Sequence, residues 1–212
     1  MNDNRNYNYQ HPSSERIEYS IIMNMIRAKS SIIDLGCGDG SLLENLIKEK
    51  NIRGQGIEIS KTGIKICQEK GLNVTEGRID IDLPFSENAF DYAICNVTIQ
   101  MVMYPEILIK EMRRIAQYQI ISFPNFAYFK NRLELLYKGR MPKHMLFGYT
   151  WYTTGHIHQL SIKDFKFFCK QCQLRIIQSV PINQPNNKIK KLLINKFPNL
   201  FSLESVFLLQ KD

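Results

Sequence analysis

Three glycines at alternate positions follow a short apolar stretch, and their spacing indicates cofactor chemistry. Residues 32–40 read IIDLGCGDG, and residues 41–47 continue with the pattern of a helix. Glycine lets the backbone adopt φ values closed to other residues and lets a ligand lie against bare backbone. A helix that begins beside such a turn presents its first N–H groups to the ligand. We therefore predict a turn that binds a cofactor containing a nucleoside.

The glycine spacing separates two classes of cofactor. Dinucleotide-binding turns follow G-x-G-x-x-G, which would place a glycine at position 41, where this chain has Ser41. The third glycine is Gly40 instead, and Asp34 stands two residues before the first. This arrangement resembles the E/D-x-G-x-G-x-G turn of class I methyltransferases, which hold S-adenosylmethionine (SAM). The resemblance implies cofactor contacts from Asp34, Gly36, Cys37, Gly38 and Gly40.

An acidic residue stands where such a site needs one. Residues 54–59 have the pattern of a second strand, and Glu58 near its end lies about 20 residues beyond the glycines, the separation at which a carboxylate binds ribose. An ionised carboxylate only accepts hydrogen bonds, so it suits a diol. The alternative is a plain tight turn and an exposed charge at a strand end. Asp34 before the turn and Glu58 after it favour the cofactor.

Two later loops follow predicted strands and are expected at the same edge of the sheet. Methyltransferases commonly place an Asp directly after a Gly to accept a hydrogen bond from adenine, but this chain has Arg78 there, and arginine only donates. Asp80 would then take the role, with Ile79 packing on the ring. Asn96 follows the fourth strand. Residues 95–98 lack the prolines of base-modifying methyltransferases, which favours a small-molecule substrate.

Candidate catalytic groups are Asn96, Tyr152 and His158. Methyl transfer needs mainly an aligned nucleophile, so the protein supplies positioning and a base. His156 and His158 could place two imidazoles on one strand face, but no third ligand stands at metal spacing, and no metal site is predicted. The pair Cys169 and Cys172 lies in a helical pattern rich in phenylalanine and is interpreted as core packing.

The elements that must position these residues alternate between strand and helix patterns. Strands are predicted at 31–35, 54–59, 72–76, 90–96, 119–123, 174–180 and 205–210, and helices at 15–28, 41–50, 61–70, 105–115, 126–137 and 161–172. Gly71 and Pro105 mark a helix end and a helix start, and Ser161 with Asp164 forms a capping pair. Such alternation predicts an α/β fold: a single Rossmann-like domain with a seven-stranded, mostly parallel sheet and helices on both faces.

Composition limits the domain organisation, the cell compartment and the kinds of partner that the chain can have. The 212 residues are 44% hydrophobic and contain no run of 18 apolar residues, which favours one globular domain, 15–212, after a flexible polar tail, 1–14, and excludes a membrane span. Five scattered cysteines indicate reduced thiols and a cytoplasmic protein. The net charge of +8 is spread along the chain, and its tightest run, residues 188–191, is interpreted as a solvated helix face. This distribution of charge argues against a nucleic-acid partner.

Motifs in the second half of the chain narrow the resemblance from class I methyltransferases in general to one family. It is similar to the methionine biosynthesis protein W (MetW) family, from about residue 17 to the C-terminus. The matching motifs are LGCGDGSLL at 35–43, TIQ at 98–100, FPNF at 123–126, KGRMP at 138–142, YTWYTT at 149–154, IH at 157–158 and FPNL at 197–200. The chain departs from the family at Arg78, where Asp is usual, at His156, where Asn is usual, and in its extra tail.

This resemblance implies a SAM-binding protein of the methyltransferase fold that acts as the partner needed for full activity of a homoserine O-acyltransferase. Two alternatives stay open: a SAM-dependent methyltransferase of a small metabolite, and an RNA methyltransferase, which only the charge supports. The aromatic-rich stretch 123–151 would serve as a substrate lid or as a protein interface. Alternatively, Tyr149, Trp151 and Tyr152 merely close the core.

Overall fold

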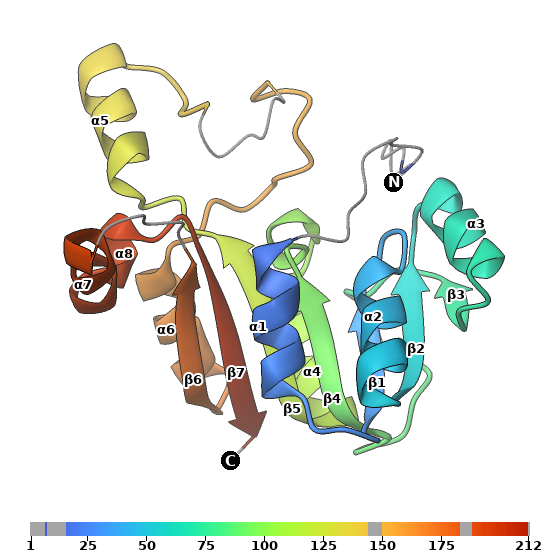
Figure 1. Ribbon diagram of the computed structural model, residues 1–212. Helices are drawn as coiled ribbons and strands as arrows, with labels where there is room; N and C mark the ends of the chain where they lie inside the picture. The colour runs from blue at the N-terminus through green and yellow to red at the C-terminus, as the bar shows by residue number, and fades with distance from the viewer. Residues whose placement is uncertain (1–6, 8–15, 144–149, 183–187, 212) are drawn as a thin grey trace.

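The computed structural model of the protein describes residues 7, 16–143, 150–182 and 188–211. A seven-stranded sheet in the order β3-β2-β1-β4-β5-β7-β6 forms its centre (Figure 1). The strands are β1 (Ser31–Leu35), β2 (Arg53–Glu58), β3 (Val74–Glu76), β4 (Phe90–Asn96), β5 (Ala116–Pro124), β6 (Leu174–Ile182) and β7 (Glu204–Lys211). Strands β1 to β5 pair in parallel, and β7 runs antiparallel to both of its neighbours. The predicted seven-stranded, mostly parallel sheet is confirmed.

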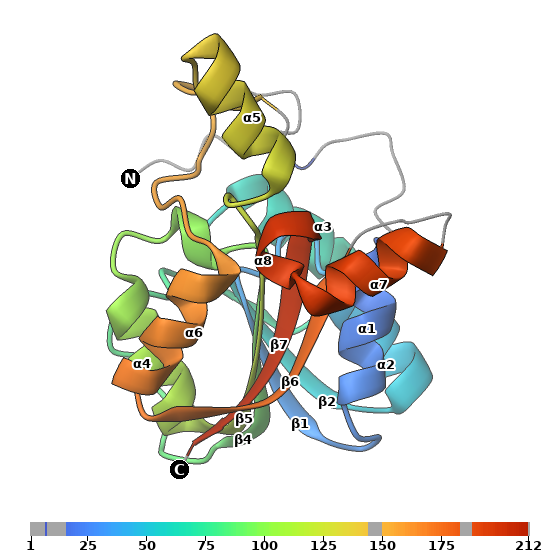
Figure 2. The same ribbon diagram turned by 90° about the vertical axis from the view of Figure 1, so that its left-hand side faces the viewer.

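Helices cover both faces of this sheet (Figure 2). They are α1 (Ile17–Met25), α2 (Ser41–Lys50), α3 (Lys61–Glu69), α4 (Pro105–Ile115), α5 (Phe129–Lys138), α6 (Ile162–Gln171), α7 (Lys188–Lys196) and α8 (Pro198–Phe201), with a 3-10 turn, η2 (Ile99–Met101). Helices α1 and α2 lie on one side in Figure 2, and α4 and α6 lie on the other. The α/β architecture with helices on both faces is therefore as predicted.

Alternating side chains of the strands supply two separate apolar cores. On one face Ile32 of β1 packs in a cluster with residues of α1 and α2. On the other face Ile33 and Leu35 join a cluster with α4 and α6, where the rings of Phe123, Phe165 and Phe207 meet at centroid distances of 4.7 to 5.6 Å. Each fully buried Ile, Leu or Phe contributes about 1.5–3 kcal/mol. These two cores fix the carboxyl ends of the strands, where the site lies.

Local capping signals explain several helix starts. Pro105 stands in the first turn of α4, as expected. Ser161 precedes α6 and accepts a hydrogen bond from the Asp164 amide, while the Asp164 carboxylate accepts one from the Ser161 amide. This is the reciprocal capping box that the sequence predicted. Gly71 adopts a φ of 71° just after α3, which ends at Glu69.

Some predicted bounds were wrong. The first helix, expected at 15–28, spans Ile17–Met25, and Ile26 is already extended; residue 15 lies outside the described residues. The strand expected at 72–76 begins only at Val74, because the Leu72 amide still donates to the Cys67 carbonyl and closes α3. The helix expected from residue 126 begins at Phe129.

The late start of α5 has a tertiary cause. The amide of Asn125 donates to Leu203, its side chain donates to Asn199 and Ser202, and the Phe126 amide donates to Leu160. Residues 125–126 are therefore tied to neighbouring segments and cannot enter a helix. Helices α7 and α8 fill the stretch between β6 and β7, where only the helix face at 188–191 was expected. Strand β5 is also longer than expected and begins directly after α4.

The described helices are short compared with a bilayer. A helix needs about 20 apolar residues to cross one, and α4, with 11 residues, is the longest in the described part of the chain. No described helix qualifies as a membrane span.

Candidate cofactor site

The glycine turn joins β1 to α2 and has the backbone conformation that requires glycine. Gly36, Gly38 and Gly40 have φ values of 80°, 59° and 72°. A Cβ on Gly36 would lie 2.7 Å from the Thr98 side chain, and one on Gly40 would lie 2.4 Å from Leu72. Side chains at these positions would therefore be strained and would clash.

Backbone hydrogen bonds and side-chain packing against the neighbouring strand β2 hold this turn in place. The amides of Gly36 and Cys37 donate to the Ile57 carbonyl at 2.8 and 3.2 Å. The Cys37 side chain is buried toward β2, where a Cβ on Gly56 would lie 2.7 Å from its sulfur. A hydrogen bond with Cys67 and burial raise the pKa of the Cys37 thiol, so it stays protonated. Cys37 therefore offers its backbone, and not a reactive thiol, to a ligand.

Glu58 ends β2 directly beside the turn. Its side chain is buried, and one carboxylate oxygen accepts a hydrogen bond from the Gly38 amide at 2.6 Å. The other oxygen accepts from the amides of Ile59 and Ser60 at 2.9 and 2.8 Å. Three backbone donors thus fix the orientation of the carboxylate that the sequence predicted for ribose.

Asp34 is a buried carboxylate with an unsatisfied oxygen. It lies in β1, is 2% exposed, and its Oδ1 has no hydrogen-bond partner among the described residues. Burial, and then the charge of Glu58, raise its pKa to about 7. Burying a carboxylate without a partner is costly. A cationic ligand group beside Asp34 would remove that cost, so the site suits a positively charged cofactor.

Asp80 is bound from several sides. Arg78 donates to both of its oxygens at 2.9 and 3.0 Å, and the amides of Met103 and Tyr104 donate to Oδ2 at 2.9 and 3.2 Å. Burial raises the pKa of Asp80, but these bonds outweigh burial and the net shift is downward. Ile79 is 6% exposed and belongs to the core cluster. The Met103 and Tyr104 amides thus tie Asp80 to the segment before α4, and the adenine roles of Asp80 and Ile79 stay predictions.

The loop after β4 meets the glycine turn. Asn96 accepts a hydrogen bond from the Ser122 hydroxyl at 2.5 Å. Val97 has a φ of 51°, which is unusual for a β-branched residue and costs about 1–3 kcal/mol. Its amide donates to the Ser122 carbonyl and hydroxyl. This strained turn brings Thr98 against Gly36, so the Asn96 loop and the cofactor turn form one surface.

The other two catalytic candidates, Tyr152 and His158, lie in different surroundings, and their catalytic roles stay predictions. Tyr152 is 69% exposed and packs edge-on against Trp151, which is 70% exposed, so neither ring closes the core; Tyr149 lies outside the described residues. The amide of His158 donates to the Gln100 carbonyl at 3.0 Å, which ties this segment to η2.

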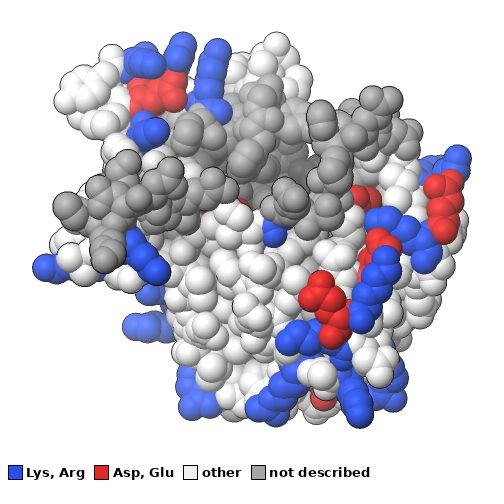
Figure 3. All heavy atoms as spheres, in the orientation of Figure 1, with Lys and Arg blue, Asp and Glu red and all other residues white. Residues whose placement is uncertain are grey.

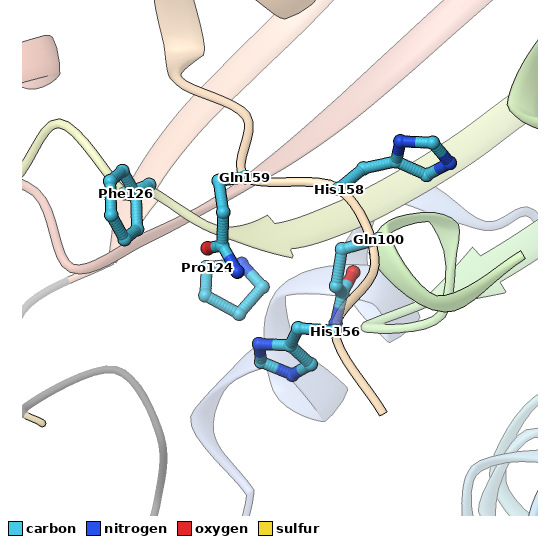
Figure 4. A pocket seen from close by; sticks show the side chains of 6 residues that line it. All are labelled: Gln100, Pro124, Phe126, His156, His158 and Gln159. Atoms are coloured by element: carbon cyan, nitrogen blue, oxygen red, sulfur yellow. The ribbon is translucent and has the colours of Figure 1, made fainter. Parts of the chain in front are cut away.

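His158 and His156 do not share a face. They border a small cavity, about 10 Å³, together with Gln100, Pro124, Phe126 and Gln159, and their rings point to opposite sides of the chain (Figure 4). The volume is enough for about one water molecule. The suggestion of two imidazoles on one strand face was wrong, because residues 156–158 are not in a strand. Within the described ranges no group of three metal-ligating side chains occurs.

Tyr7 is a site residue that the sequence did not indicate. A Cβ on Gly38 would lie 3.0 Å from its ring, and one on Gly63 would lie 3.2 Å from it. The Tyr7 amide donates to the Thr62 hydroxyl at 3.1 Å. The rest of the predicted tail, 1–6 and 8–14, lies outside the described residues. No pattern in that polar stretch distinguishes Tyr7, so its contact with the turn could not be foreseen.

Comparison with known proteins decides the family. The family described as methionine biosynthesis protein MetW matches residues 16–209. The chain belongs to the MetW family. A bifunctional methionine biosynthesis protein MetXA/MetW of Rhodopirellula baltica is 31% identical over 191 residues, which are 80% of this chain and 31% of that protein. The chain thus spans about a third of this relative, and the MetW resemblance seen in the sequence is confirmed.

Solved structures show the fold of this MetW-family chain. A SAM-dependent methyltransferase of Thermotoga maritima is similar with a TM-score of 0.62 and 17% identity, covering 92% of this chain and 87% of that one. A geranyl diphosphate C-methyltransferase of Streptomyces coelicolor, in complex with S-adenosyl-L-homocysteine, has a TM-score of 0.61 and 13% identity, covering 92% and 78%. The MetW-family chain has the class I methyltransferase fold.

Proposed function

We propose that this MetW-family protein binds SAM and acts as the activating partner of a homoserine O-acyltransferase in methionine biosynthesis. The relative that carries both the MetXA and the MetW names in a single chain is the observation on which the partnership rests. Two domains that are fused in one chain in some organisms commonly bind each other where they are separate proteins. The acyltransferase is therefore the first partner to test.

The residues of the glycine turn fit SAM. When bound, SAM supplies a cationic sulfonium and an activated methyl group. The unsatisfied Asp34 oxygen provides a negative partner for a cationic ligand, and the fixed Glu58 carboxylate provides acceptors for ribose. Because the glycines of the turn carry no side chains, its backbone is proposed to lie close to the bound SAM. Asn96, joined to this surface through its loop, is proposed to border the cofactor.

The surface charge favours a protein or small-molecule partner over nucleic acid. On the face shown in Figure 3, many Lys and Arg side chains lie beside Asp and Glu at the lower right, and a broad uncharged area lies toward the centre. Phosphate recognition needs cations gathered along one track. The five cysteines are free, which suits the reducing cytoplasm as the site of action.

The deciding experiment measures the acyl-transfer rate of the homoserine O-acyltransferase of the same organism, with and without this protein, across a SAM titration. We expect a large increase that saturates at a fixed stoichiometry. An unchanged rate would contradict the partnership and transfer the proposal to methylation of a small metabolite, with Asn96 and His158 as the first residues to vary.

SAM binding is tested separately by calorimetry. Glu58→Ala should weaken SAM binding by about 1–3 kcal/mol, because it removes an acceptor for the ribose. Glu76→Ala is the matched control: Glu76 is paired with Glu58 in the β2–β3 register but is exposed. Equal SAM affinities in the two variants would argue against the ribose role, and absence of binding at millimolar SAM in the unmodified protein would rule out the cofactor.

A further inference from the structure

Helix α5 projects from the body of the protein. It extends beyond the sheet edge formed by the carboxyl ends of the parallel strands (Figures 1 and 2). Only its first turn is anchored: the Phe129 and Phe201 rings lie 5.7 Å apart, and the buried Asn131 side chain donates to the Phe126 carbonyl at 3.0 Å. Asn131 is the one buried residue of this helix. The remaining turns of α5 face solvent.

One side of this projecting helix is apolar. Residues three or four positions apart on a helix share a face. The exposed Leu133, Leu136 and Tyr137 of α5 have this spacing, and the exposed Met141 follows just beyond the end of the helix. We call them the apolar α5 surface: Leu133 (44% exposed), Leu136 (73%), Tyr137 (78%) and Met141 (44%). A helix shorter than about 12 residues is marginal without a packed apolar face. Exposed apolar groups of this kind mark interaction sites.

The rim of the apolar α5 surface is basic. Five exposed cations surround it, namely Lys130, Arg132, Lys138, Arg140 and Lys143. The acidic residue of the helix, Glu134, is bound by Arg140 at 2.9 Å and by the Lys143 amide at 3.2 Å. In Figure 3 uncharged atoms and Lys and Arg side chains lie together at this corner of the molecule. A partner must offer an apolar groove with an acidic rim.

We propose that the apolar α5 surface is the docking site for the acyltransferase, whose complementary surface is an apolar groove edged by Asp and Glu. This inference rests on the proposed function. A second copy of this chain fits less well, because a two-fold contact through the surface would set five cations against five. The acyltransferase is the partner that the fused relative places beside a MetW-family domain.

The test removes the apolar side chains without touching the cofactor site. The double variant Leu136→Ala, Tyr137→Ala is compared with Phe167→Ala, which truncates a 63% exposed aromatic on α6. Calorimetry measures the affinity of each protein for the acyltransferase of the same organism. We expect binding at least tenfold weaker for the double variant, binding within twofold for Phe167→Ala, and unchanged SAM affinity and melting temperature in both. The charge-reversal pair Lys138→Glu, Arg140→Glu should weaken binding most at low salt.

The outcomes separate this inference from the proposed function. Absence of binding by the unmodified protein would overturn the partnership and the docking site together. Normal binding by the double variant, with normal binding by the unmodified protein, would overturn the docking site alone. A third outcome is that the unmodified protein forms a dimer, the double variant is a monomer, and both bind the acyltransferase equally. That outcome would assign the surface to a second copy of this chain and would also overturn the proposal.

Discussion

At the scale of single residues, we predict that the buried carboxylate of Asp34 makes the affinity for SAM depend on pH. Burial and the Glu58 charge raise its pKa to about 7, and its Oδ1 has no partner within the described ranges. A cation binds the ionised form, so below pH 7 binding must release a proton. We expect SAM affinity to fall by up to about tenfold per pH unit below 7 and to level off above it.

Calorimetry at pH 6 and pH 8, in two buffers of different ionisation enthalpy, would detect that proton. The variant Asp34→Asn should bind SAM weakly at both pH values and release no proton. If the unmodified protein shows the same affinity and no proton release at pH 6, the cationic group does not lie at Asp34.

The same carboxylate should make the ligand-free protein less stable at high pH. Its pKa is higher in the folded state than the ordinary 3.8, so the folded state binds more protons between about pH 4 and pH 7. Stability therefore falls as pH rises through that window and stays low above it. The cost of ionisation is on the order of 4 kcal/mol, and Asp34→Asn removes it.

Thermal unfolding without SAM checks this prediction. Asp34→Asn should melt several degrees higher than the unmodified protein at pH 8 and close to it at pH 5. The exposed Asp82 supplies the control, because Asp82→Asn should leave the melting temperature unchanged at both pH values. A lower melting temperature for Asp34→Asn at pH 8 would show that the Asp34 carboxylate has a stabilising partner in the ligand-free protein and would contradict the prediction.

At the scale of elements, the helices with local start signals were predicted well. The first turn of α4 contains Pro105, and α6 begins at the Ser161 and Asp164 capping box. The start of α5 was misplaced because Asn125 is held by Asn199 and Ser202, which lie more than 70 positions away in the chain. Such contacts leave no trace in a short sequence window. The same holds for Tyr7, which reaches the cofactor turn from the tail.

The capping box gives a prediction at this scale. Ser161→Ala removes the hydroxyl that accepts a hydrogen bond from the Asp164 amide, and should destabilise the protein by about 1 kcal/mol. For a chain of this size the melting temperature should fall by about 2–4 °C. Ser20, whose exposed hydroxyl donates to the Ile17 carbonyl, provides the control. Equal melting temperatures for Ser161→Ala and Ser20→Ala would show that the capping box carries no net stability.

At the scale of the whole molecule, the glycine spacing and the strand alternation were enough to predict the fold, because each reflects a backbone requirement. Gly36, Gly38 and Gly40 all adopt positive φ, and the alternation of strands and helices reflects parallel strands that are joined by helices. An interface role for the stretch 123–151 was one of the predictions left open. The exposure of the apolar side of α5 could not be predicted, because the amphipathic pattern of residues 126–137 does not show whether that side meets the core or a partner. Burial of that side is a tertiary outcome.

This architecture places the cofactor turn and α5 at the same edge of the sheet, after β1 and β5, which run in parallel with β4 between them. If SAM regulates the acyltransferase through this protein, each of the two ligands must change the affinity of this protein for the other. Linkage requires the two changes to be the same factor. We expect these two factors, measured by calorimetry of each ligand with and without the other, to agree and to lie within about 5–150-fold.

The variant Leu136→Ala, Tyr137→Ala should bind SAM normally, yet its SAM affinity should no longer respond to the acyltransferase. Equal SAM affinity with and without bound acyltransferase would show that the cofactor site and the partner site act independently.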